Sequence, residues 1–181
     1  MNEGSESEPT PMKNPTTVER TSEREIVVTR TVNGPARLVF EAWTKAELFR
    51  RWWVPKSFGL TLLSCEMDVR VGGQYRLVFR HGDSTMAFFG TYREVTPPSR
   101  LVWTNAEGDD GETVTTVTFD EKAGKTLLVV HDLYPSKDAL DAANQLGIYW
   151  LARYLQDRPL ADLTDPGSTQ LFDVGGQGIE Q

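Results

Sequence analysis

The side chains that could carry acid–base chemistry are few and lie far apart in this sequence. His131 falls in a strand-like run in phase with Leu127 and Val129, and if that face points inward, His131 lies at a cavity wall. An imidazole in such a place would suit proton transfer at neutral pH. The alternative is a hydrogen-bonded histidine near the end of a strand. His81 stands beside a Gly-Asp turn, where we expect an ordinary exposed histidine.

Two carboxylates, Glu66 and Asp68, share one face of a predicted strand, as an acid and a base acting together could. Their neighbours Cys65 and Met67 take the opposite, less polar face, so we expect both carboxylates to face solvent. The acidic run at 109–112 lacks the spaced ligands of a calcium loop, and the glycine-rich run near the C-terminus follows no strand. We therefore predict no catalytic residue, no cofactor and no metal site, which favours a protein that is not an enzyme.

Aromatic and apolar side chains are the remaining residues from which a functional site could be built. A pocket lined by such side chains, with a few polar groups among them, is the usual form of a small-molecule site. The candidates for ligand contact are Trp52, Trp53, Phe58, Met67, Tyr75, Leu77, Phe79, Trp103, His131, Ala143, Asn144, Gly147 and Trp150. Asn144 or His131 would orient a polar group of the ligand.

Short segments with strand character, separated by turn residues, must position most of these candidates. A β-branched run near residues 24–32 predicts the first strand. Six more strands are expected at 60–70, 74–80, 85–96, 100–105, 113–120 and 126–132. Their connections hold glycine, proline and aspartate and are too short for parallel crossovers, so they predict an antiparallel meander.

Helical segments flank the predicted meander on both sides. Two short helices are expected after the first strand, with Pro35 in the first turn of one and Thr44 capping the other. A long helix is predicted from Ser136 to Leu155, because apolar residues recur there at three- and four-residue steps. Ser136 is its expected N-cap. We predict an α+β fold in which a curved antiparallel sheet of about seven strands wraps around this helix.

Charge and composition set the limits of the predicted domain within the 181 residues. Residues 1–22 are rich in polar residues and are expected to form a disordered arm, 23–156 to form one domain, and 157–181 to form a flexible acidic tail. The net charge of −7 lies mostly in the two ends, which gives no footprint for nucleic acid. The single cysteine and the lack of a long apolar run lead us to expect a cytoplasmic protein with no membrane span.

Several motifs in order are similar to the bacterial family named for homology to the activator of the heat-shock-protein-90 ATPase. They are the stretch at 29–55 with its Trp52-Trp53 pair, the stretch at 67–76 with Gly72-Gly73, and the stretch at 90–102 with Pro97-Pro98. The resemblance covers roughly residues 24–156 and implies the START-like (SRPBCC) helix-grip fold around a hydrophobic cavity. Val54 and Ala143-Asn144 depart from the pattern of that family, which puts the pocket shape and the ligand in question.

Three functions follow from this reading. The leading hypothesis is a module that binds a hydrophobic small molecule or lipid between the curved sheet and the C-terminal helix. The second, implied by the resemblance, is a co-chaperone or protein-interaction module that acts on a heat-shock-protein-90 homologue. The third, by analogy of fold, is a cyclase or hydratase with His131 or a carboxylate in its pocket. The protein is expected to be a monomer or a homodimer.

Overall fold

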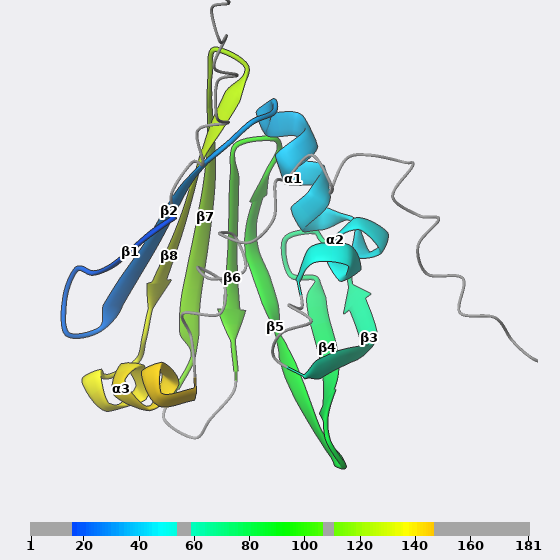
Figure 1. Ribbon diagram of the computed structural model, residues 1–181, viewed down its shortest axis with the longest axis vertical. Helices are drawn as coiled ribbons and strands as arrows, with labels where there is room; N and C mark the ends of the chain where they lie inside the picture. Colours follow the sequence, from blue (N-terminus) through cyan, green and yellow to red (C-terminus); the bar gives the residue numbers. More distant parts are fainter. Residues whose placement is uncertain (1–15, 54–58, 107–110, 147–181) are drawn as a thin grey trace, which may run out of the picture.

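The computed structural model describes residues 16–53, 59–106 and 111–146. In these ranges one antiparallel sheet carries two short helices against one face, and a third helix follows the last strand (Figure 1). The elements are β1 Thr17–Arg20, β2 Glu25–Val32, α1 Ala36–Thr44, α2 Ala46–Trp52, β3 Leu60–Met67, β4 Gln74–His81, β5 Ser84–Thr96, β6 Arg100–Asn105, β7 Thr113–Lys122, β8 Lys125–Leu133 and α3 Lys137–Leu146. This arrangement confirms the predicted α+β helix-grip class.

The eight strands lie in the order β1-β2-β8-β7-β6-β5-β4-β3, and each neighbouring pair is antiparallel. β3 to β8 form a continuous meander, as the short connections predict. β3 ends at Met67, three residues before the predicted end. The cause is a turn in which the amides of Arg70 and Gly73 donate to the carbonyls of Asp68 and Arg70.

β1 corrects one expectation, because it lies inside the segment predicted to be a disordered arm. It pairs with β2 from Thr17 opposite Thr29 to Arg20 opposite Ile26, and Val18 packs against the core. The Arg20 guanidinium also reaches Asp141 on α3 at 2.7 Å. A polar segment gains order here because β2 satisfies its backbone groups, which composition alone does not report. Residues 1–15 and the predicted tail at 157–181 lie outside the described residues.

The inner face of the sheet carries the core, because alternate residues of each strand point to the same side. On β8, Leu128 and Val130 are buried while Leu127 is exposed, and β7 buries Val117 and Phe119 in the same way. α1 covers this face. Its apolar side chains, among them Val39, Phe40 and Trp43, are buried.

The junction of α1 and α2 differs in one detail from the prediction. The Thr44 hydroxyl donates to the Phe40 carbonyl at 2.8 Å inside α1. It therefore does not cap α2, whose N-cap position is Lys45, with no side-chain hydrogen bond. α2 is fixed to α1 by the indole of Trp52, which donates to the carbonyl of Ala42 at 2.8 Å.

α3 begins as predicted. The hydroxyl of Ser136 accepts from the backbone N–H of Ala139 at 3.0 Å, which confirms the N-cap, and Leu140 on the first turns is fully buried. In Figure 1, α3 lies beside the end of the sheet formed by β1, β2 and β8. The described helix stops at Leu146, so the predicted continuation to Leu155 lies outside the described residues.

Candidate functional site

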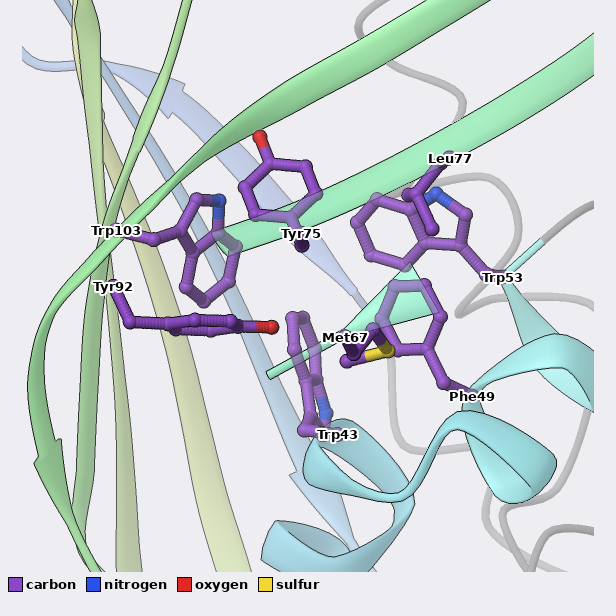
Figure 2. Close-up of a pocket in the computed structure, with 8 residues that line it drawn as sticks. All are labelled: Trp43, Phe49, Trp53, Met67, Tyr75, Leu77, Tyr92 and Trp103. Carbon is purple, nitrogen blue, oxygen red and sulfur yellow. The ribbon is translucent and has the colours of Figure 1, made fainter. Parts of the chain in front are cut away.

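A small cavity of about 30 Å³ lies between the helices α1 and α2 and the strands β3 to β6. Figure 2 shows its lining side chains, which converge from these elements. The residues that line it are Trp43, Phe49, Trp53, Met67, Tyr75, Leu77, Tyr92 and Trp103. We call this set the aromatic pocket.

The strand register explains why five of these side chains meet. Met67 lies opposite Tyr75, and Tyr92 lies opposite Trp103, all at inward-pointing positions of neighbouring strands. Leu77 follows Tyr75 by two residues on β4 and so shares its face. The helix pair supplies the remaining wall.

Packing between rings holds the helix side of the pocket. Phe49 and Trp53 are one helical turn apart and stack, with ring centroids 4.4 Å apart. Trp43 lies 6.0 Å from Trp53 and 6.1 Å from Trp103, so it joins the helices to the sheet. Tilted and edge-to-face contacts of this kind add about 0.5–1.5 kcal/mol per pair beyond the burial of area.

Gly90 on β5 allows the sheet side of the pocket to form. It lies opposite Tyr75, and a β-carbon at this position would stand 1.6 Å from the carbonyl oxygen of Thr104 and 2.9 Å from the Tyr75 ring. Because Gly90 has no side chain, the Tyr75 ring can cross β5. Its hydroxyl then reaches the Thr104 carbonyl on β6 at 3.3 Å.

A chain of hydrogen bonds runs from the pocket across the sheet to β8. The Tyr75 hydroxyl and the Trp103 indole N–H both donate to Asn105 Oδ1, the indole at 3.2 Å. The Asn105 amide donates to Thr115 Oγ1 at 2.9 Å, and the Thr115 hydroxyl donates to Asp132 Oδ1 at 2.6 Å. We call Asn105, Thr115 and Asp132 the polar chain.

The polar chain ends at a carboxyl group with a shifted pKa. Burial raises the pKa of Asp132 to about 6, while the hydrogen bond from Thr115 and the nearby His131 act in the opposite direction. Burial also raises the pKa of the Tyr92 phenol and of the Cys65 thiol. Among the described residues, those that line the aromatic pocket include no carboxylate, amine or guanidinium.

The structure brings together five of the predicted contact residues, namely Trp53, Met67, Tyr75, Leu77 and Trp103. Trp52 and Phe79 do not line the pocket. Trp52 is buried between α1 and α2, and Phe79 is buried further along β4, where it packs edge-on against Phe88 at 5.4 Å.

His131 is a correction, because it lies on the outer face of the sheet. Leu128 and Val130 on β8 are buried, so the alternate set of Leu127, Val129 and His131 points outward. His131 Nε2 lies 3.1 Å from Glu25 Oε1 on β2. The phase of β8 is hard to predict because its middle, residues 127–130, is apolar on both faces and no polar face there marks the outside. Its inward-facing neighbour is Asp132.

The remaining candidates lie on or beyond α3 and in one loop. Ala143 is partly buried and packs against the core, but it does not line the pocket. Asn144 falls within α3, although its side chain is outside the described part of the structure. Phe58, Gly147 and Trp150 also lie outside the described residues. Glu66 and Asp68 are both exposed, as expected.

Sequence reasoning missed Trp43, Phe49 and Tyr92 as pocket residues, and it missed the whole polar chain. The i, i+4 spacing of Phe49 and Trp53 is a signal that could have found Phe49. A glycine two residues before Tyr92 in a long strand is another signal, since such a glycine often marks a close approach. Nothing in the spacing of Asn105, Thr115 and Asp132 indicates that they meet, because their contact depends on strand register.

Within residues 16–53, 59–106 and 111–146, no three His, Cys, Asp or Glu side chains gather closely enough to hold a metal ion. In the same ranges, none of the helices has the length and apolar character needed to cross a membrane.

Comparison with known proteins places the chain among structural relatives. The model of the family described as Activator of Hsp90 ATPase homolog 1-like protein matches residues 33–155. No curated protein matches the chain.

Solved structures share the fold. A protein from Arthrobacter aurescens has a TM-score of 0.71 at 16% identity, over 89% of this chain and 98% of its own. One from Mycobacterium smegmatis has a TM-score of 0.70 at 20% identity, over 83% and 98%. One from Chromobacterium violaceum has a TM-score of 0.60 at 28% identity, over 78% and 98%. These likenesses show the fold and leave the function to be argued from the site.

Proposed function

Since this chain belongs to the family described as Activator of Hsp90 ATPase homolog 1-like protein, as its motifs indicated, we propose that it binds a hydrophobic small molecule in the aromatic pocket. The observation that carries the proposal is the pocket itself, in which eight aromatic or apolar side chains surround a space within the core. Family membership fits a module for small-molecule or chaperone interaction. The pocket favours the small molecule.

The size of the pocket sets a condition on binding. A cavity of about 30 Å³ has room for about two water molecules, whereas small-molecule sites usually have about 300–1,000 Å³. A ligand must therefore displace side chains as it enters. Trp53 and Met67 are lining residues that are only partly buried, so their movement would enlarge the space with little loss of packing, whereas the Trp103 ring is held in place by its hydrogen bond to Asn105.

The chemistry of the walls restricts the ligand to an uncharged molecule. A charge placed among these rings would lose its hydration and would meet no opposite charge from any lining residue in the described part of the chain. The protons of Tyr75 and Trp103 are already directed at Asn105, so a ligand with a strong acceptor would compete with an existing bond. A neutral aromatic or aliphatic molecule fits best.

A matched pair of fluorescent probes tests this proposal. N-phenylnaphthylamine is neutral, and anilinonaphthalene sulfonate is the same skeleton with a negative charge. We expect the neutral probe to gain fluorescence and to quench the pocket tryptophans on titration, and the sulfonate to bind more weakly. Met67→Trp adds bulk inside the pocket and should abolish binding. Leu127→Trp adds the same group on the outer face and should not.

A folding control and two possible results would show whether the proposal is wrong. Each variant is first shown to unfold cooperatively at a denaturant concentration near that of the wild type. Equal binding by the Met67→Trp and Leu127→Trp variants would mean that the probe uses another surface. Tighter binding of the sulfonate than of the neutral probe would exclude an uncharged ligand.

A second candidate is an interaction with a chaperone, and exposed apolar residues favour it. Leu63 and Phe89 are 43% and 48% exposed, and they lie on β3 and β5 at outward-facing positions of the sheet. Exposed apolar residues that gather in one region can mark a protein contact. An ATPase assay with a heat-shock-protein-90 homologue separates the two functions. A Phe89→Ser variant should lose stimulation if the contact exists, and the Met67→Trp variant should keep it.

A further inference from the structure

The polar chain links the aromatic pocket to a carboxyl group that does not itself line the pocket. We propose that Asp132, acting through Thr115 and Asn105, is a positioning residue that fixes the hydrogen-bond direction at the polar end of the pocket, so that protonation of Asp132 weakens binding of the neutral ligand. The ligand part of this inference rests on the proposed function. The direction of the hydrogen bonds does not.

The direction follows from what each group can donate. An ionised carboxylate only accepts, so the single proton of the Thr115 hydroxyl goes to Asp132. Thr115 Oγ1 is then the acceptor for the Asn105 amide N–H. This turns Asn105 Oδ1 toward the pocket, where it accepts hydrogen bonds from the Tyr75 hydroxyl and the Trp103 indole N–H. The charge on Asp132 thus fixes the positions of two side chains that line the pocket, Tyr75 and Trp103.

When Asp132 is protonated, the hydrogen bonds of the polar chain are no longer fixed in this direction. A neutral carboxyl can donate to Thr115 Oγ1, which frees the Thr115 proton to point toward Asn105. The Asn105 amide then gains by rotating its oxygen toward Thr115 and its NH2 group toward the pocket. The Trp103 indole is a donor only and would face another donor, so its hydrogen bond is lost. The ring of Trp103 is then free to shift within the pocket.

The surroundings of Asp132 determine the pH range in which it is protonated, and that range is mildly acidic. Opposite Asp132, β2 presents Ile26 and β7 presents Thr115, and neither titrates. Burial therefore dominates and raises the pKa of Asp132 to about 6. The nearest imidazole is His131, the next residue on β8, which is paired with Glu25 on the outer face.

Two of the other charged side chains near this end of the sheet, Arg24 and Lys137, have partners of their own. The Arg24 guanidinium donates to the Tyr134 carbonyl at 2.9 Å. On α3, Lys137 pairs with Asp141 at 2.5 Å, and Asp138 lies in the first turn. No hydrogen bond or ion pair joins any of them to Asp132 among the described residues. A titration of the polar chain can therefore be assigned to Asp132 once His131 is controlled for.

The indole N–H resonance of Trp103 in the ligand-free protein reports the polar chain directly. Trp103→Phe assigns the resonance. Between pH 4.5 and 8 we expect it to shift with a midpoint near the pKa of Asp132, about 6. Asp132→Asn should remove the transition. His131→Gln should keep it, which separates the carboxyl from the neighbouring imidazole.

Thr115→Val separates a hydrogen-bond chain from a through-space effect of charge. Valine keeps the shape of threonine at this buried strand position but has no hydroxyl. We expect the Trp103 transition to disappear in this variant. Thr118→Val on the same strand, outside the polar chain, should leave it intact. A transition of full amplitude in Thr115→Val or in Asp132→Asn would overturn the positioning role.

The ligand arm uses N-phenylnaphthylamine with the wild type and with Asp132→Asn. Loss of one hydrogen bond in the pocket wall corresponds to an affinity about fivefold lower, so we expect a drop of this size as the pH falls below 6 in the wild type only. Equal affinity at all pH values would overturn the coupling to the ligand. A Trp103 transition with no probe binding would leave Asp132 as a positioning residue and count against the proposed function instead.

Discussion

At the scale of single residues, Asp132 and Gly90 each lie at a strand position that would ordinarily hold a different type of residue. Asp132 lies on the inner face of β8 between apolar positions, where a carboxyl group opposes folding when it is ionised. Gly90 lies where any side chain would meet the backbone of β6. Each departs from what its strand would prefer, and such departures are expected where a structure serves a function.

Asp132 should lower the stability of the folded protein as the pH rises through the mildly acidic range. Its pKa is raised from 3.8 to about 6, so the folded state holds a proton that the unfolded state has released between these values. Stability is therefore highest below pH 3.8 for this group and declines as the pH rises to 6. Between pH 4 and pH 8, the free energy of unfolding of Asp132→Asn should therefore rise by about 2 kcal/mol relative to that of the wild type, after an allowance for the partial exposure of the side chain.

Urea denaturation of both proteins at the two pH values measures this difference. Asp120→Asn, at an exposed position of β7, is the matched control and should show little change. A constant difference between wild type and Asp132→Asn across the pH range would show that the carboxyl titrates normally in the folded protein.

Gly90→Ala should destabilise the protein strongly. Its β-carbon would lie 1.6 Å from the Thr104 carbonyl oxygen, which belongs to the backbone of a central strand and cannot move alone. We expect a loss of about 3 kcal/mol or more in the free energy of unfolding, in the range of severe overpacking. Gly34→Ala is the control, because no atom lies within 4 Å of the added carbon. Similar urea midpoints for the two variants would contradict the account of Gly90.

At the scale of elements, the sequence predicted more than it did at the scale of residues. Period-two alternation and turn residues located β3 to β8, and the N-cap at Ser136 was located by its hydroxyl and position. The pairing of β1 with β2 was not predicted, because a short polar strand owes its order to its neighbour. Features that depend on neighbouring residues in the sequence could be predicted, whereas the pairing of β1, which depends on a separate strand, could not.

The N-cap at Ser136 gives a prediction that belongs to this scale. Ser136→Ala leaves the Ala139 N–H without its acceptor at the start of α3, so we expect a loss of about 1 kcal/mol. Ser136→Asp keeps an acceptor and adds a charge that favours a helix N-terminus, so it should restore the stability of the wild type. Thermal unfolding of the three proteins distinguishes these outcomes. If the aspartate variant were as unstable as the alanine variant, the side chain would not be acting as a cap.

At the scale of the whole molecule, the fold class and five of the eight residues of the aromatic pocket could be predicted from the sequence. Met67, Tyr75, Leu77 and Trp103 were predictable because alternate residues of a strand share one face, and Trp53 was predictable from the helical spacing of apolar residues before Pro55. The polar chain was not predictable. It depends on which residues of β4, β6, β7 and β8 lie side by side, and a one-residue change in register would separate them.

The aromatic pocket is also a place where packing is incomplete, and this links binding to global stability. A ligand that binds the folded state alone stabilises it by about 2.7 kcal/mol at 100 times its dissociation constant. For a chain of this length that corresponds to a rise in Tm of about 5–10 °C. We expect N-phenylnaphthylamine to raise the Tm of the wild type and of Leu127→Trp by this amount, and to leave Met67→Trp unchanged because its pocket is filled. An equal rise in all three would place the probe on the exposed apolar surface at Leu63 and Phe89.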